Sequence, residues 1–232
     1  MPSFAVRENV CVRQTAPRAQ GTPQLTPVGM IATAPHVLVV TAKMPFKTLA
    51  ELVAYAKAHP GELNFGSAGA GGLGHLGTEL FARAAQVDIK HVPYRGAAAA
   101  MTDLVSGQIH AMFGTMPSFT GHLQNGLLRV VGVTAPSAAA PLKGIPLISD
   151  TVRGFGYKSW NALFTPAGTP ASVIARLYAA VKKASVDSEV ARRFEEQGVD
   201  IELADAAALT DMIRKETALW DKVIREANIQ VN

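Results

Sequence analysis

The clearest signal of the fold is the segment LNFGSAGAGGLGHLGTELF, residues 63–81. The run LNFGS (63–67) predicts a short strand, and the pattern after it predicts a helix over roughly residues 73–86. Five glycines lie within residues 66–74, and glycine lets a chain turn tightly where a strand passes into a helix. The segment therefore predicts a strand, a glycine-rich turn and a helix, which is a building unit of α/β proteins.

The same alternation of strands and helices extends to both sides of this turn. Further strands are expected at residues 28–32, 36–40, 89–94, 109–113 and 128–134. Further helices are expected at about residues 48–59, at 97–105 and in the residues leading to Asn125, and a Pro- and Ala-rich surface connection is expected at 135–147. This order predicts the α/β fold class with mostly parallel sheets.

The C-terminal part of the chain is predicted to be largely helical. Pro170 can open a first helix, Asp187 can cap a second, and Asp205 can cap a long third helix. The first and third helices each carry an apolar stripe, so we expect both stripes to pack into the core. Their members are Val173, Ile174, Leu177, Tyr178 and Val181 in the first helix, and Leu209, Met212, Ile213, Leu219, Trp220, Val223 and Ile224 in the third.

Composition excludes several classes of protein. The chain has 232 residues, of which 48% are hydrophobic and 17% charged, so it can bury a substantial core. The basic residues behind its net charge of +4 are scattered, which is typical of a solvated surface and not of a nucleic-acid interface. Cys11 is the only cysteine, which excludes intramolecular disulfides and cysteine-rich zinc sites. No apolar run approaches the roughly 20 residues of a membrane span, so we expect no membrane insertion.

Residues 1–24 differ from the rest of the chain. They combine arginine, proline and glutamine with little periodicity, and they lack the apolar stretch of a secretory signal. We therefore expect a disordered leader ahead of the folded part.

The glycine-rich turn is the main chemical signal in the sequence. Backbone N–H groups at the start of a helix can bind an anion, and the helix dipole favours negative charge there. The spacing Gly69-x-Gly71-x-x-Gly74 also matches a dinucleotide-binding fingerprint, which leaves a small nucleotide-binding enzyme as an alternative. That fingerprint requires an acidic residue at the end of the next strand, where this chain has Tyr94 and Arg95.

Other catalytic patterns are not supported. No Lys-Ser/Thr pair follows the glycines, which excludes a phosphate-binding P-loop, and Phe65 stands where a hydrolase nucleophile turn at Ser67 requires glycine. His75, His91 and His110 are candidates for acid-base chemistry, although a histidine in a half-buried element is more often structural. No metal-binding spacing is present either. The residues therefore predict no catalytic group, no metal and no cofactor.

Four spaced motifs together resemble one known family. They are FGSAGAGGLGHLGTELF (65–81), HVPYRGAAAAMTDLVSGQIHAMFG (91–114), LRVVGVTAPSAAAPLKGIP (128–146) and SWNALFTPAGTPASVIARL (159–177). In this order they resemble the substrate-binding proteins of tripartite tricarboxylate transporters, the Bug receptors, and the resemblance runs from about Leu25 to Ile229.

The resemblance implies a two-lobed fold of the type II periplasmic-binding-protein kind. The second lobe would span residues 36–128 and carry the glycine turn, while residues 25–35 and 129–232 would form part of the first lobe. The segments 25–40 and 128–134 look like the two crossings between the lobes. The family begins with a signal peptide and further first-lobe elements that are not recognisable in residues 1–24, so we expect an incomplete first lobe.

The implied function is solute binding and not catalysis. A periplasmic monomer of this family would bind a small organic carboxylate and deliver it to the membrane permease subunits of the transporter. A degenerate remnant that no longer binds is a further alternative. The ligand residues implied by the resemblance are Ser67, Ala68, Gly69, Ala70, Gly71, Gly72 and His75 in the turn, with Tyr94 and Thr115 in the next two loops; the amides of residues 69–72 would hold carboxylate oxygens. Because Gly114 and Thr115 stand where the family often has an acid, a plain carboxylate is expected in preference to an amino acid.

Overall fold

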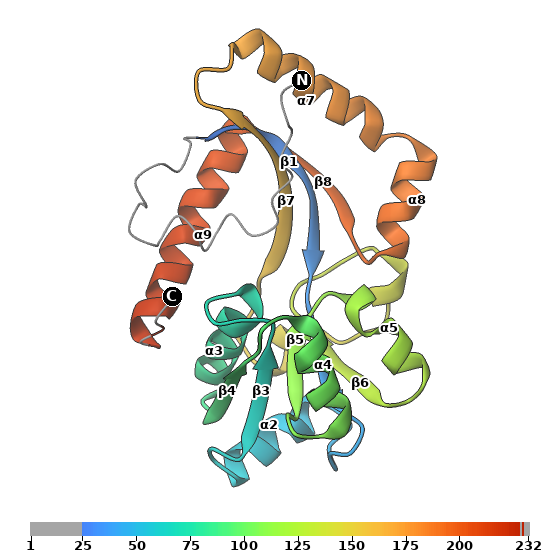
Figure 1. Ribbon diagram of the computed structural model, residues 1–232, viewed down its shortest axis with the longest axis vertical. Helices are drawn as coiled ribbons and strands as arrows, with labels where there is room; N and C mark the ends of the chain where they lie inside the picture. Colours follow the sequence, from blue (N-terminus) through green and yellow to red (C-terminus); the bar gives the residue numbers. More distant parts are fainter. Residues whose placement is uncertain (1–24, 228, 230–232) are drawn as a thin grey trace.

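The computed structural model describes residues 25–227 and residue 229, so the expected leader at residues 1–24 lies outside the described part. Two β-sheets lie along the long axis of the molecule (Figure 1). The strands are β1 (Leu25–Pro35), β2 (Val37–Thr41), β3 (Leu63–Ser67), β4 (Ile89–Pro93), β5 (Ala111–Gly114), β6 (Leu128–Val133), β7 (Lys158–Pro166) and β8 (Asp200–Asp205). The helices are α2 (Leu49–Ala58), α3 (Leu73–Ala85), α4 (Ala97–Ser106), α5 (Met116–Gln124), the 3-10 helix η1 (Ala140–Leu142), α6 (Ile148–Thr151), α7 (Ala171–Ser185), α8 (Ser188–Glu196) and α9 (Ala206–Glu226).

Local capping signals determine where several helices begin and end. The Thr48 side chain accepts a hydrogen bond from the amide of Glu51, whose carboxylate accepts one from the Thr48 amide, so α2 begins with a capping box. Asp187 and Asp205 cap α8 and α9 through their carboxylates, as predicted. Gly107 ends α4 in the left-handed region at φ +84°, a conformation that favours glycine.

The larger sheet has five strands in the order β4-β3-β5-β2-β6. Strand β3 pairs in parallel with β4 and β5, whereas β2 pairs antiparallel with β5 and β6. Buried residues of β2 pack on both of its faces: Leu38 and Val40 join one hydrophobic cluster, and Val37 and Val39 join another. We call this sheet and the helices α2 to α6 around it the second lobe.

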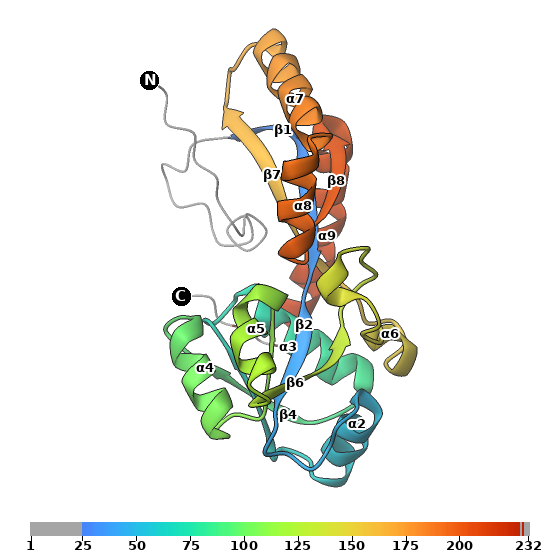
Figure 2. The ribbon, with the colours of Figure 1, turned by 90° about the vertical axis from the view of Figure 1, so that its right-hand side faces the viewer.

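The smaller sheet has three strands in the order β7-β1-β8, and both of its strand pairs are antiparallel. We call this sheet, with α7, α8 and α9, the first lobe; Figure 2 shows it above the second lobe. The prediction of mostly parallel sheets was therefore wrong, although the α/β class with two lobes is confirmed. The physical reason is that β2 enters the larger sheet at the edge where β3 and β5 end, so it must run against them.

The two crossings between the lobes differ from the expected pair. The first lies where it was expected, because β1 continues through His36 into β2. The second was expected at residues 128–134, but those residues form β6 inside the larger sheet and its end. The chain returns to the first lobe after Tyr157, at the start of β7. We propose that the second lobe extends to Tyr157, beyond the boundary expected after Leu128.

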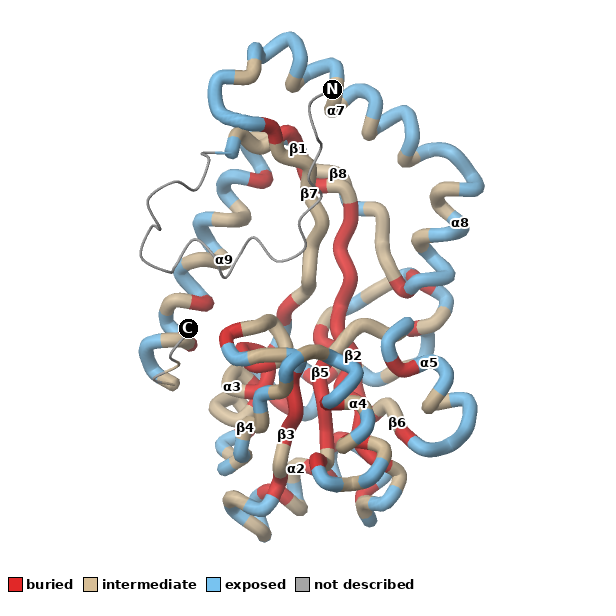
Figure 3. Tube along the Cα trace, in the orientation of Figure 1, coloured by how far each residue is buried: buried red, intermediate tan, exposed pale blue. Residues whose placement is uncertain are grey.

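The apolar stripe of α7 is less buried than expected. No residue of α7 or α8 is buried, and Val173 is 40% exposed, as Figure 3 shows by the pale colour along both helices. The expectation of a core position was therefore wrong for this stripe. In α9, Leu209, Trp220 and Val223 are buried as expected, but Leu219 is 40% exposed. A three-stranded sheet offers too narrow a surface to cover the full length of three helices.

Acid should destabilise the crossing at His36. The residue is 8% exposed and its Nδ1 lies 3.2 Å from the Tyr157 hydroxyl; burial lowers the pKa of His36 to about 4, from 6.5. The unfolded chain therefore binds a proton first, so this stabilisation is complete above pH 6.5 and is lost as the pH falls towards 4. The loss should reach about 3 kcal/mol.

Urea unfolding between pH 7 and 4.5 measures this effect. A His36→Asn variant keeps an acceptor for Tyr157 but does not titrate, so its free energy of unfolding should fall less steeply with pH than that of the parent. Equal slopes for the two proteins would contradict the assignment.

Candidate functional site

The candidate site lies at the edge of the larger sheet where its parallel strands end. Strands β4, β3 and β5 are parallel neighbours, so their carboxyl ends meet at one edge. Ser67 ends β3, Tyr94 follows β4, and Thr115 follows β5. Figure 1 shows that this edge is directed towards the first lobe. Topology therefore brings together the three loops that the sequence singled out.

The glycine turn itself has a defined shape. Gly71 adopts the left-handed region at φ +73°, where a side chain would be strained, and Gly72 is the N-cap of α3 without any side-chain cap. The first helical amides, those of Leu73, Gly74 and His75, have no acceptor in the described part of the chain. Four such unpaired donors are usual at a helix start, and together with the dipole they attract negative charge.

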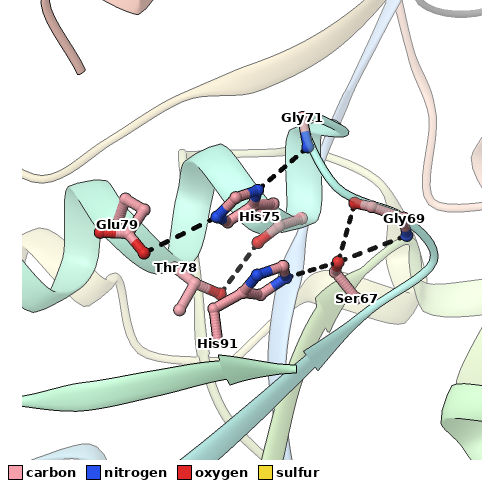
Figure 4. A network of polar contacts seen from close by, with 8 residues as sticks. Ser67, Gly69, Gly71, His75, Thr78, Glu79 and His91 are labelled. Atoms are coloured by element: carbon pink, nitrogen blue, oxygen red, sulfur yellow. Dashed lines mark hydrogen bonds and ion pairs between the residues drawn. The ribbon is translucent and has the colours of Figure 1, made fainter. Parts of the chain in front are cut away.

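A network of polar side chains holds the turn from below (Figure 4). The buried Ser67 hydroxyl donates to the carbonyl of Gly69 at 2.9 Å and lies 2.7 Å from Nε2 of His91. The His91 ring stacks on the ring of His75, with 3.6 Å between centroids and 7° between planes. Nδ1 of His75 accepts a hydrogen bond from the amide of Gly71 at 3.0 Å. Both ends of the turn are thus tied to one pair of stacked rings.

The electrostatics of the network favour a neutral His91 ring. Burial, followed by the neighbouring His75, lowers the pKa of His91 to about 4, and Glu79 partly opposes this shift. Oε1 of Glu79 lies 3.7 Å from Nε2 of His75 on the next helical turn. An imidazole that accepts at Nδ1 from Gly71 and faces a carboxylate with Nε2 carries its proton on Nε2. Because its pKa is lowered to about 4, His91 is uncharged at neutral pH.

The expected ligand donors are only partly free. Of the four amides at residues 69–72, that of Gly69 donates to Ser67, that of Gly71 to His75, and that of Gly72 to the carbonyl of Gly69 at 3.4 Å. The amide of Ala70, an exposed residue like Ala68, has no acceptor in the described part of the chain. The donors available to an anion are therefore Ala70 and the first helical residues, and the roles expected for the other turn amides stay predictions.

The two expected residues outside the turn are engaged locally. The Tyr94 hydroxyl donates to Asp103 on α4 at 2.7 Å, and burial together with that bond raises the pKa of Tyr94 to about 12. The Thr115 hydroxyl lies 3.1 Å from that of Ser118, within the first turn of α5. Their direct contact with a ligand stays a prediction.

The contact of His91 with the glycine turn was not predicted from the sequence. His91 was noted only as one of three histidines, and its 16-residue separation from His75 contains no local signal of contact. The positions of the strands could have predicted this contact, because His91 and Ser67 both lie near the ends of predicted neighbouring strands. Parallel pairing matches Phe65 with His91. Side chains on adjacent parallel strands come close at such positions.

Within residues 25–227, no cluster of three or more His, Cys, Asp or Glu side chains could hold a metal ion. Over the same residues, no helix has the length and apolar character needed to cross a membrane.

Comparisons with known proteins agree with one another. Residues 18–229 match the profile of the tripartite tricarboxylate transporter family receptor. A UPF0065 protein encoded in the tcbD-tcbE intergenic region of Pseudomonas sp. strain P51 is 34% identical over 215 residues, which are 92% of this chain and 64% of that protein. Protein BugT of Bordetella pertussis is 29% identical over 208 residues, or 89% of this chain and 64% of its own length. The chain thus spans about 64% of these relatives.

Solved structures resemble the fold over most of the chain. The R. palustris protein Rpa4515 with adipate is 31% identical with a TM-score of 0.80, over 91% of this chain and 72% of that one. MatC from Rhodopseudomonas palustris with bound malate is 26% identical with a TM-score of 0.75, over 92% of this chain and 75% of that one.

Proposed function

This chain belongs to the tripartite tricarboxylate transporter family of solute-binding receptors, and from that premise we propose that it binds a small dicarboxylate and delivers it to a membrane permease. The proposed place of action is the periplasm, because a related structure at 29% identity is described as a periplasmic transporter. The proposed ligand position is the edge of the larger sheet, between the two lobes.

The main support is the set of unpaired donors at the start of α3. The amides of Ala70, Leu73 and Gly74 lack acceptors in the described part of the chain, and they lie at the positive end of a 13-residue helix. Backbone donors of this kind bind carboxylate oxygens well and contribute typically about 0.3–1 kcal/mol through the dipole alone. No acidic residue lies in the turn between Ser67 and His75. The turn is thus suited to an anion.

The site also favours a plain carboxylate over an amino acid. An ammonium group would need an acidic partner, and the loop after β5 offers Gly114 and Thr115 instead. Asp103, the carboxylate near the loop after β4, already accepts a hydrogen bond from Tyr94 of that loop. The related structures hold adipate and malate, which are both dicarboxylates. We therefore expect a dicarboxylate of four to six carbons, although backbone amides alone do not select a carbon skeleton.

Titration calorimetry with adipate and malate tests the proposal. We expect a dicarboxylate to bind, and a thermal shift to follow, because a ligand at 100 times its Kd stabilises a protein by about 2.7 kcal/mol. Raising the salt concentration should weaken binding by less than about ten-fold, since a partly enclosed charge pair is screened less than an exposed one. Glucose and lysine serve as neutral and cationic controls. Preference for either control over every dicarboxylate tested would refute the proposal.

A further inference from the structure

The amide of Gly71 is directed into the protein and not towards solvent. It donates to Nδ1 of His75 four residues later, at 3.0 Å, and both residues are buried. This bond closes the turn onto the first turn of α3. Gly71 has a positive φ, and the bond fixes the orientation of the peptide group that carries the Gly71 N–H.

The His75 ring has little freedom to move away from this bond. The side chain is 11% exposed and its ring stacks on His91, whose own ring is held at 2.7 Å by the Ser67 hydroxyl. Ser67 in turn bonds the Gly69 peptide through both its carbonyl and its amide. Rotation of His75 would therefore break both the stack and the bond from the Gly71 amide.

The tautomer of His75 follows from its two neighbours. Nδ1 can accept from the Gly71 amide only while it carries a lone pair, so the ring proton belongs on Nε2. Oε1 of Glu79 lies 3.7 Å from Nε2 and favours a proton there. Glu79 thus selects the tautomer that the turn requires, as carboxylates commonly do for functional histidines.

From this geometry we propose that His75 is a positioning residue for ligand binding. Its unprotonated Nδ1 fixes the turn in the shape that leaves the amides of Ala70, Leu73 and Gly74 free for a carboxylate. His75 itself does not contact the ligand in this assignment. The inference rests on the proposed function, because it concerns the same site.

Two substitutions at His75 separate positioning from simple packing. His75→Asn places an amide oxygen near the position of Nδ1 and should bind adipate or malate within about three-fold of the parent. His75→Leu keeps the bulk but offers no acceptor, and it should weaken binding at least about ten-fold, or 1.4 kcal/mol. Equal binding by the leucine variant and the parent, or equal weakness of both variants, would overturn the assignment.

A matched control exists in the same lobe. Nδ1 of His110 accepts from the amide of Asn64 at 3.0 Å, which is the same kind of bond at the opposite end of β3. His110→Leu should therefore lower stability without changing affinity for the dicarboxylate. Weakening of binding by His110→Leu as large as that by His75→Leu would show a general effect of lost stability and would overturn the assignment.

Nitrogen-15 NMR of the ligand-free protein gives a readout that does not depend on binding. At pH 7.5 we expect His75 to show an unprotonated Nδ1 and a protonated Nε2, and the Gly71 amide signal to move in His75→Leu more than in His75→Asn. The opposite tautomer would overturn the positioning role. If the parent binds no dicarboxylate while this tautomer is observed, the proposed function fails and the structural role of His75 in shaping the turn stands.

Discussion

Replacing Gly71 by valine is expected to weaken dicarboxylate binding about 100-fold while leaving the helix content near that of the parent. Gly71 has φ +73°, a region that is unfavourable for a β-branched side chain. The turn can relieve this strain only by changing its peptide orientation, which breaks the bond from the Gly71 amide to His75. The donors at the start of α3 would then be misplaced, and a 100-fold loss corresponds to about 2.7 kcal/mol.

Calorimetry and circular dichroism together measure this result. Gly126→Val is a matched control, because Gly126 also has a positive φ of +67° and has open space around it. Gly126 precedes β6, whose first residue pairs with Thr41 at the opposite edge of the sheet from the turn. This variant should lose stability but keep its affinity. An unchanged affinity in Gly71→Val would place the ligand elsewhere.

Replacing Phe113 by alanine is expected to lower the free energy of unfolding by about 3–5 kcal/mol. Phe113 is 2% exposed and lies at the centre of an aromatic cluster, with ring centroids 5.8–6.3 Å from four neighbours. These neighbours are Phe65, Phe81, Phe155 and Tyr157. Truncation would leave a cavity that these large rings cannot fill without leaving their own positions.

The loss should also reach the contact between the lobes. Tyr157 packs edge-on against Trp220 of α9 and bonds His36 at the first crossing. Urea unfolding followed by tryptophan fluorescence would report both changes, since Trp220 is one of the two tryptophans. Leu127→Ala, at a side chain that is 42% exposed, should cost less than about 0.5 kcal/mol. Similar losses in the two variants would contradict the cluster's role.

Much of the fold could be predicted because its signals are local. The strand, turn and helix at residues 63–81 depend on neighbouring glycines and apolar spacing, and the structure reproduces them within one residue. Caps at Thr48, Asp187 and Asp205 act on amides two or three residues away, so they too can be read along the chain. The proposal that the turn binds an anion rests on the same short-range geometry.

The residues that support the turn from a distance and the way the lobes join are determined by tertiary packing. The stack of His75 on His91 arises because β3 and β4 pair in parallel, and no local pattern specifies that register. The direction of β2 follows from the edge at which the crossing chain enters the sheet. The exposure of α7 depends on the width of a sheet formed by three separated segments. Periodicity along a helix shows which side is apolar, but the surface that covers that side is built by other parts of the chain.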